Sequence, residues 1–170
     1  MSEDGFLEAA MRMRDKLYHV AIAILWNEQD AADAVQDAML KGWKHRGSLR
    51  DEAQFEVWFM RILVNQCRDL QRKQIRRRRL AEDVRREGRT SVRAESGGEL
   101  LEAIRGLPEA QRLPVLLYYF DGYSQKEIGA ILGCTAEKVK SRMRQARVKL
   151  REELERGEGT ERGKGGKRRG

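Results

Sequence analysis

Polar and basic side chains cluster between residues 138 and 147, with a spacing that places them on the outer face of a helix. Arginine and lysine can bond phosphate oxygens and the acceptor edge of guanine, and glutamine can bond adenine. Such a set suits the major groove of double-stranded DNA. A solvated basic helix without a special function is the alternative. The predicted DNA-binding residues are Lys138, Lys140, Ser141, Arg142, Arg144 and Gln145.

A second polar set follows helical spacing in the N-terminal half of the chain. Its members recur at i, i+4, i+7 and i+11, opposite an aromatic stripe. Six bases also fall within residues 72–79, enough to follow a phosphate backbone. A solvated helix end is the simpler alternative, because the helix dipole favours cations at a C-terminus. We predict that nucleic acid binds this second set, which comprises Arg61, Asn65, Arg68 and Arg72.

A third polar set is acidic and lies opposite a stripe of small apolar residues within residues 29–43. Residues 1–40 hold three bases against eight acids, although the whole chain has a net charge of +8. An acidic N-terminal segment and a basic remainder suggest two kinds of partner surface, with nucleic acid facing the basic part. Alone, such a face is more often plain surface than a binding site. The set comprises Asp33, Gln36 and Asp37.

Patterns that would support catalysis or metal binding are missing from the sequence. There is no Ser-His-Asp or Cys-His set and no phosphate-binding glycine loop, and His19 and His45 lie far apart. Cys67 and Cys134 form no CxxC pair and are predicted to be a core residue and a turn residue, with a redox role left open. We therefore predict no enzyme, no catalytic residue, no metal or cofactor, and no small-molecule substrate.

The basic cluster near the C-terminus requires a helix-turn-helix to position it. Ser124 and Glu127 match a capping box that begins one helix, and Gly133 ends that helix. Thr135 is a suitable N-cap for the second helix. Gly129 is small enough to let the two helices cross closely. The inward residues are Ile128, Ile131 and Leu132 on the first helix, then Val139, Met143, Ala146 and Leu150 on the second.

Helical periodicity dominates the rest of the chain, and strand alternation is scarce, so we predict an all-α fold. An aromatic and aliphatic stripe begins at Phe55 and continues to Leu70, which makes that helix the centre of an N-terminal core. A helix should follow Pro108, and Pro114 should make it kink or restart near Leu113.

Shifts in composition divide the chain into two small helical domains joined by a flexible linker. The linker is mixed in charge and almost free of large side chains, and the last 14 residues contain no apolar side chain. We expect the free protein to sample several relative domain positions. The predicted segments are 1–79, an N-terminal domain; 80–98, the linker; 99–156, the helix-turn-helix domain; and 157–170, a disordered basic tail.

The composition is that of a strongly charged chain, with 36% charged and 6% aromatic residues. Its longest apolar stretches, residues 20–26 and 115–120, are shorter than the roughly 20 residues that a bilayer helix needs. The N-terminus is acidic and does not resemble a secretory signal. We predict a cytoplasmic protein without direct membrane insertion.

Taken together, the motifs resemble the extracytoplasmic-function (ECF) branch of the sigma-70 family. The run DAADAVQDAMLKGW at residues 30–43 resembles region 2.2. The run FEVWFMRILVNQCRDLQRK at residues 55–73 resembles regions 2.3 and 2.4. Residues 107–147, including V-K-S-R, resemble region 4. Two such regions with only a short linker between them are typical of the ECF branch.

This resemblance implies a sigma factor that recruits bacterial RNA polymerase core to double-stranded and locally melted promoter DNA, under control of an anti-sigma factor. It implies that the acidic set docks on the clamp helices of the largest polymerase subunit. Residues 46–54 would capture a flipped base of the −10 element, helped by the second polar set. The helix from residue 136 would read the −35 element.

A stand-alone helix-turn-helix transcriptional regulator is the alternative, and it would need a dimerisation surface and an effector pocket. One departure from the family pattern concerns DNA preference. Glu137-Lys138 stands where the family commonly has Gly-Thr, which places an acid at the start of the recognition helix. Glutamate can accept a hydrogen bond from cytosine, so a changed promoter preference would follow.

Overall fold

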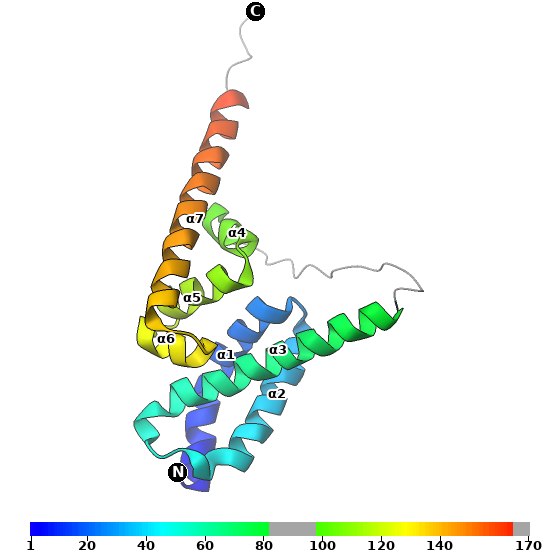
Figure 1. Ribbon diagram of the computed structural model, residues 1–170, viewed down its shortest axis with the longest axis vertical. Coiled ribbons are helices and arrows are strands. Elements are labelled where there is room, and N and C mark those ends of the chain that lie inside the picture. The colour runs from blue at the N-terminus through cyan, green and yellow to red at the C-terminus, as the bar shows by residue number, and fades with distance from the viewer. Residues whose placement is uncertain (82–97, 165–170) are drawn as a thin grey trace, which may run out of the picture.

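The structure is a computed structural model that describes residues 1–81 and 98–164 of the 170-residue chain. These residues form seven α-helices and two short 3-10 helices, with no strand among them, as the all-α prediction requires. Figure 1 shows α1, α2 and α3 in the lower part of the view and α4 to α7 above them, with the C-terminal part of α7 extending away from the other helices. The helices are α1 (Glu3–Leu25), α2 (Glu28–His45), α3 (Phe55–Ala81), α4 (Glu99–Gly106), α5 (Glu109–Tyr119), α6 (Gln125–Leu132) and α7 (Ala136–Lys164), with η1 (Arg46–Ser48) and η2 (Glu52–Gln54) before α3.

Helices α1 to α3 form the N-terminal unit, and a two-residue turn joins the first two. Trp26 ends α1 with a left-handed backbone at φ 55°, and its N–H donates to the carbonyl of Ile22. Asn27 then caps α2 by accepting from the N–H of Asp30 at 2.9 Å. Because both helix ends are satisfied within this turn, α1 and α2 are held as a tight antiparallel pair.

The small-residue stripe of α2 lets the aromatic stripe of α3 approach closely. A Cβ atom added to Gly42 would lie 2.7 Å from the ring of Phe59, so only glycine fits there. Phe6 of α1 makes edge-to-face contacts with Trp43, Phe55 and Phe59, with ring centroids 5.6 to 5.7 Å apart. Aromatic pairs in this geometry contribute about 0.5–1.5 kcal/mol each beyond their burial.

Helices α4 to α7 form the C-terminal unit, which contains the predicted helix-turn-helix. The capping box of Ser124 and Glu127 is present at the start of α6, and Gly133 ends that helix in the left-handed region at φ 71°. The Oγ1 atom of Thr135 accepts from the N–H of Lys138 at 3.2 Å and so caps α7. A Cβ atom on Gly129 would lie 2.6 Å from the carbonyl oxygen of Cys134, which confirms the close approach predicted for this glycine.

Helix α5 runs through Pro114 as one element, so it does not restart there, and the alternative of a kink near Leu113 stays a prediction. A proline inside a helix costs about 3 kcal/mol. Its neighbours Leu113 and Leu117 are 1% and 0% exposed, and each fully buried leucine contributes about 1.5–3 kcal/mol. Burial on both sides of the proline therefore offsets the cost of the missing hydrogen bond.

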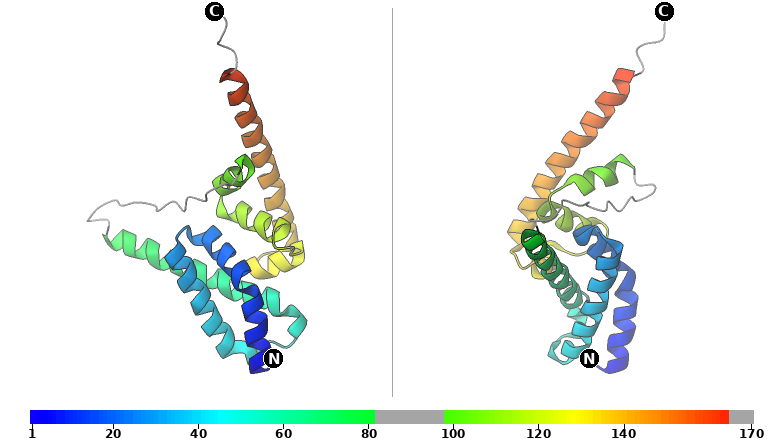
Figure 2. Two further views of the ribbon diagram at one scale, coloured as in Figure 1. Left: turned by 180° about the vertical axis from the view of Figure 1, so that it is seen from behind. Right: turned by 90° about the vertical axis from the view of Figure 1, so that its right-hand side faces the viewer.

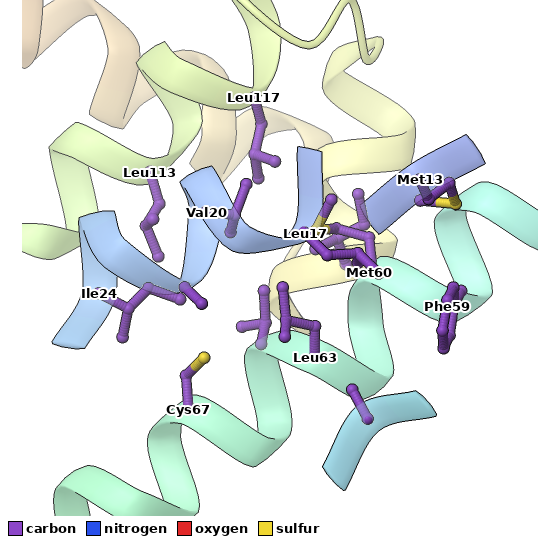
Figure 3. Close-up of a cluster of buried hydrophobic side chains, with 14 of the residues drawn as sticks. Met13, Leu17, Val20, Ile24, Phe59, Met60, Leu63, Cys67, Leu113 and Leu117 are labelled. Carbon is purple, nitrogen blue, oxygen red and sulfur yellow. The ribbon is translucent and has the colours of Figure 1, made fainter. Parts of the chain in front are cut away.

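The two units share one hydrophobic core. Figure 3 shows Leu113 and Leu117 of α5 pointing toward Val20 and Ile24 of α1, and Cys67 of α3 lies in the same cluster. The views in Figure 2 agree that α6 lies against α3. This packing differs from the expectation of freely placed domains. The periodicity of each helix shows that it has an apolar face but does not show which unit covers that face.

The ends of the units are also longer than the composition suggests. Helix α3 continues to Ala81 and α7 continues to Lys164, beyond Gly157, where the sequence predicts the start of a disordered tail. Residues 82–97 of the predicted linker and residues 165–170 of the predicted tail lie outside the described residues. No helix within the described ranges is long and apolar enough to cross a membrane.

Candidate nucleic-acid and protein interfaces

The first turns of α7 present the basic cluster to solvent. Val139 and Met143 are buried on the inner side of the helix, which turns the polar side chains outward. Arg142 is half-buried, with its Nη1 atom 3.7 Å from the sulfur of Cys134, and Gln145 accepts from Gln111 at 3.2 Å. All members except Arg142 are exposed: Lys138, Lys140, Ser141, Arg144 and Gln145. This arrangement suits a helix that enters a groove with its N-terminal end.

The polar face of α3 is only partly free. Arg61, Asn65 and Arg72 are exposed, and Arg72 pairs with Asp69 of the same helix. Arg68 is half-buried, and its Nη1 atom donates to the carbonyl oxygen of Leu132 at 3.2 Å. Leu132 is the last residue of α6, where helix carbonyls lack partners within the helix. The structure therefore does not bring the four predicted residues together on one open surface.

The acidic face of α2 is fully exposed, as its sequence position predicts. Asp33, Gln36 and Asp37 are exposed, whereas the alanine stripe on the opposite side is buried against the neighbouring helices. Asp33 accepts from Gln29 at 3.2 Å, a contact within the same exposed helix surface. The buried stripe packs α2 against its neighbours, so all three polar side chains project from the outer side of the helix.

Two further residues of α2 refine this face. Leu40 lies seven residues after Asp33 and four after Gln36, so it continues the same helix face, and it is 55% exposed. Sequence reasoning missed Leu40, because an isolated leucine in a helix is normally assigned to the core. Asp30 belongs elsewhere, since it is half-buried and accepts from Gln74 of α3 at 2.7 Å. Asp30 thus has a structural role, whereas Asp33 and Asp37 remain exposed on the acidic face.

The segment between α2 and α3 is fastened to the start of α1. Arg46 forms an ion pair with Glu3 at 2.6 Å, donates to the carbonyl of Trp43, and lies over the Trp43 ring at 4.2 Å. Asp51 caps η2 by accepting from the N–H of Ala53 at 3.0 Å. Arg46 thus fastens the start of the segment to α1 and α2, the Asp51 cap orders its second half, and the exposed residues between them form a loop edge.

Burial keeps Cys67 in its thiol form. The surrounding apolar side chains raise the pKa of Cys67 to about 12, with a smaller contribution from the charge of Glu109. A thiol of this kind is unreactive near neutral pH, because the thiolate is the nucleophile. Cys134, on the turn between α6 and α7, is only half-buried.

Comparison with protein families identifies both units. The family model described as Sigma-70 region 2 matches residues 10–79, and the one described as Sigma-70, region 4 matches residues 97–150. The ECF RNA polymerase sigma factor SigM of Mycobacterium tuberculosis is 34% identical over 147 residues, covering 86% of this chain and 75% of the relative. SigW of Bacillus subtilis is 29% identical over 168 residues, covering 89% and 90%.

Two solved structures, each of a complex, have a fold similar to that of this chain. The sigma factor RpoE in complex with the anti-sigma factor NepR from Bartonella quintana has a TM-score of 0.75 and 27% identity, covering 88% of this chain and 96% of that one. CnrH in complex with the cytosolic domain of CnrY has a TM-score of 0.66 and 26% identity, covering 91% and 90%. Sequence, architecture and the order of the two regions agree, and the chain belongs to the ECF sigma factors of the sigma-70 family.

Proposed function

We propose that this protein starts transcription by binding RNA polymerase core through α2 and promoter DNA through α3 and α7. The observation that carries the proposal is the order and exposure of the polar faces on a sigma region 2 and region 4 framework. The role needs no catalytic residue. It places the protein in the cytoplasm, where bacterial polymerase and promoters are.

Polymerase docking uses the exposed face of α2. Asp33 and Asp37 accept charge-assisted hydrogen bonds from basic groups of the polymerase, and Gln36 adds a neutral one. Leu40 lies on the same face and supplies apolar area that excludes water from these bonds. A preorganised helix surface of this kind loses little conformational entropy on binding.

Recognition of the −10 element uses α3 and the loop of residues 46–54. Arg61, Asn65 and Arg72 are exposed along one helix side and bind the single strand, and Arg68 joins them when its present contact with α6 is released. The loop edge fixed by Arg46 holds an unstacked base, which favours melting of the duplex.

Recognition of the −35 element uses the N-terminal turns of α7. Lys138, Lys140 and Arg144 are exposed and suit phosphate and guanine contacts, whereas Arg142 and Gln145 must leave their present partners to reach a base. Glu137 is exposed beside them, and it favours cytosine at the base that faces the start of the recognition helix.

Control by an anti-sigma factor is part of the proposal. It is supported by a solved structure that this chain resembles, which holds the sigma factor RpoE together with the anti-sigma factor NepR. We place the anti-sigma factor on the same units that bind polymerase and DNA, so that its binding and transcription are mutually exclusive.

The combined substitution Asp33→Ala, Gln36→Ala and Asp37→Ala tests the docking assignment. Loss of two charge-assisted bonds and one neutral bond should weaken binding to polymerase core by several kcal/mol, or on the order of a thousandfold. Circular dichroism should barely change, because these side chains lie opposite the buried stripe. The measurements are the affinity for polymerase core and run-off transcription.

A matched control removes the same number of charges from another exposed surface. The pair Glu8→Ala and Asp15→Ala on α1 should bind core like the wild type. Wild-type affinity in the folded triple variant would show that docking lies elsewhere. If the wild type bound no polymerase, the stand-alone regulator would become the better explanation.

A further inference from the structure

The C-terminal end of α3 carries a run of four arginines. All four are exposed: Arg76, Arg77, Arg78 and Arg79. None of them forms an ion pair with an acid in residues 1–81 or 98–164. Like charges three or four residues apart destabilise a helix, and Arg76 and Arg79 are three apart. The run therefore opposes the stability of α3, which is typical of residues that serve binding rather than folding.

The four arginines divide between different sides of the helix. Residues three, four or seven apart share a side of an α-helix. Arg76 lies four residues after Arg72, and Arg79 lies seven after it, so both continue the polar face of α3. Arg77 and Arg78 have the same charge and lie in the same turns, but they point to other sides. Only the first pair extends the face to which we assign nucleic acid.

The opposite side of α3 is tied to the rest of the protein as far as Gln74. Gln71 donates to the carbonyl oxygen of Ile24 at 3.1 Å and to Glu109 at 2.9 Å. Gln74 donates to Asp30 of α2 at 2.7 Å. Figures 1 and 2 show the end of α3 projecting beyond α1 and α2. The helix is thus held from its inner side, and its outer side stays open up to its last turns.

The position of the arginines along α3 places them beside paired DNA. An α-helix rises 1.5 Å per residue, so Arg76 and Arg79 lie about 17 and 21 Å from Asn65 along the axis. At 3.4 Å per base pair, this distance corresponds to about five or six base pairs. The end of α3 leads into the segment that joins it to the proposed −35-reading unit. The two arginines therefore lie on the −35 side of the −10 element, where the promoter is double-stranded.

Duplex DNA suits this pair better than an acidic protein surface does. Arg76 and Arg79 are about 4.5 Å apart along the helix axis, and their long side chains can reach successive phosphates of one strand. The guanidinium group is always charged and binds phosphate oxygens in a bidentate way. A regular row of anions is a property of nucleic acid, and the pair continues a face that already has a nucleic-acid assignment.

We propose that Arg76 and Arg79 form a binding site for the double-stranded DNA immediately on the −35 side of the −10 element. The inference rests on the proposed function of α3. By binding phosphates of the paired DNA, the two arginines hold the duplex next to the melted segment, so the boundary between paired and melted DNA lies along α3. The site contacts no base, and promoter preference stays with the rest of the polar face and with α7.

Tethered cleavage locates the DNA beside the end of α3. The wild-type protein with polymerase core first selects promoter duplexes from a random library, and one selected promoter becomes the probe. An iron chelate that cleaves nearby DNA is attached to Leu80→Cys, a position that is 80% exposed and adjoins Arg79. The background is Cys134→Ser, and the buried Cys67 remains unlabelled. Permanganate marks unpaired thymines in the same complex. Cleavage should be centred in paired DNA, within about six base pairs of the −35-side edge of the melted segment.

Two pairs of substitutions separate this site from a general effect of charge. Arg76→Gln with Arg79→Gln removes the site, and Arg77→Gln with Arg78→Gln is the matched control. The first pair should lower the affinity of the polymerase complex for the selected promoter about tenfold and should flatten the dependence of log K on log salt by about 0.9 for each lost phosphate contact. The control pair should change both quantities by less than half as much. The helix dipole alone would make the two pairs equivalent.

A shortened probe tests whether the contact is with the duplex. This probe ends at the −35-side edge of the −10 element, so it lacks the DNA that the site binds. The protein with Arg76→Gln and Arg79→Gln should bind it, in complex with polymerase core, as tightly as the wild type does. An equal loss on the full and shortened probes would mean that these arginines act on the −10 element itself.

Other results would also overturn the site. Cleavage from Leu80→Cys inside the melted segment, or no cleavage in a complex that forms, would place the duplex elsewhere. Equal losses in the two arginine pairs would reduce the run to general charge. Weaker binding of the first pair to polymerase core without DNA would show that the arginines bind protein. Failure of the proposed function is distinct, because the wild type would then bind no polymerase core or would select no promoter with it.

Discussion

Arg68 and Arg112 both bond a backbone carbonyl near the end of a helix in the other unit. Their acceptors, Leu132 and Ala23, lie 64 and 89 residues away in sequence. Spacing alone places Arg68 with the exposed polar set of α3 and gives no reason to single out Arg112. Long-range partners of this kind are invisible to helical periodicity, which describes only the face of one helix. The exposure of an arginine close to an apolar stripe is therefore hard to predict from helical spacing alone.

At the same scale, Lys140 and Arg142 should separate base reading from general phosphate attraction. Arg142→Ala or Lys140→Ala should cost about 1–3 kcal/mol of promoter-specific binding if the native side chain bonds guanine in a bidentate way, and selectivity should fall. Lys149→Ala, further along α7 and also exposed, should weaken binding to all sequences alike. Titration of specific and scrambled duplexes measures both effects. Equal losses on the two duplexes would show that Arg142 and Lys140 contact phosphates only.

The thiol of Cys67 gives a pH prediction whose sign follows from its burial. Its pKa is raised from 9.0 to about 12, so the folded state retains a proton that the unfolded state loses first. The resulting stability is present below pH 9 and is lost as the pH rises toward 12. Chemical denaturation at several pH values should show a shallower loss in Cys67→Ala than in wild type. Some loss should remain, because burial also raises the pKa of Tyr123. Identical slopes in the two proteins would contradict this assignment.

At the scale of elements, the helix-turn-helix is well predicted from sequence, because the interactions that begin and end its helices act between residues close together in the chain. A capping box and a left-handed glycine each depend on atoms within a few residues, and both are present at Ser124 and Gly133. The aromatic stripe of α3 does not include Met60 and Val64, although both are 0% exposed. Both belong to the core cluster that the two units share. A helix that is covered on two sides shows no single apolar stripe. The second element that packs on α3 could therefore be identified only from the structure.

Gly129 provides a stability test at this scale. Alanine normally favours a helix over glycine, but a Cβ atom here would meet the carbonyl oxygen of Cys134 at 2.6 Å. Gly129→Ala should therefore destabilise the protein by about 1–3 kcal/mol, as overpacking does. Gly106→Ala is the control, since nothing lies within 4 Å of its Cβ position. Thermal unfolding followed by circular dichroism distinguishes them, and equal midpoints would show that the helix-turn-helix relaxes around the added methyl group.

For the whole molecule, the sequence supports the fold class and the family but not the contact between units. The apolar faces of α1 and α5 both belong to the core, and their periodicity does not identify the partner across the boundary. The linker composition favours free domains because it contains few large side chains, yet the shared core depends on residues outside the linker. Whether the two units pack together thus depends on the surfaces that face each other, and the composition of the linker does not determine it.

The charge of the whole chain leads to the last prediction, which concerns residues 157–170. This segment holds five bases and two acids, a net charge of +3, and has no apolar side chain. Its attraction to DNA should therefore be electrostatic and independent of sequence. Deleting it should lower the affinity for specific and scrambled duplexes by the same factor and should flatten the dependence of log K on log salt, by about 0.9 for each phosphate that the shortened protein no longer neutralises. Because Arg142 and its neighbours on α7 remain in place, the ratio of the two affinities should stay constant. A changed ratio after the deletion would mean that the tail contacts bases or positions α7 in the groove.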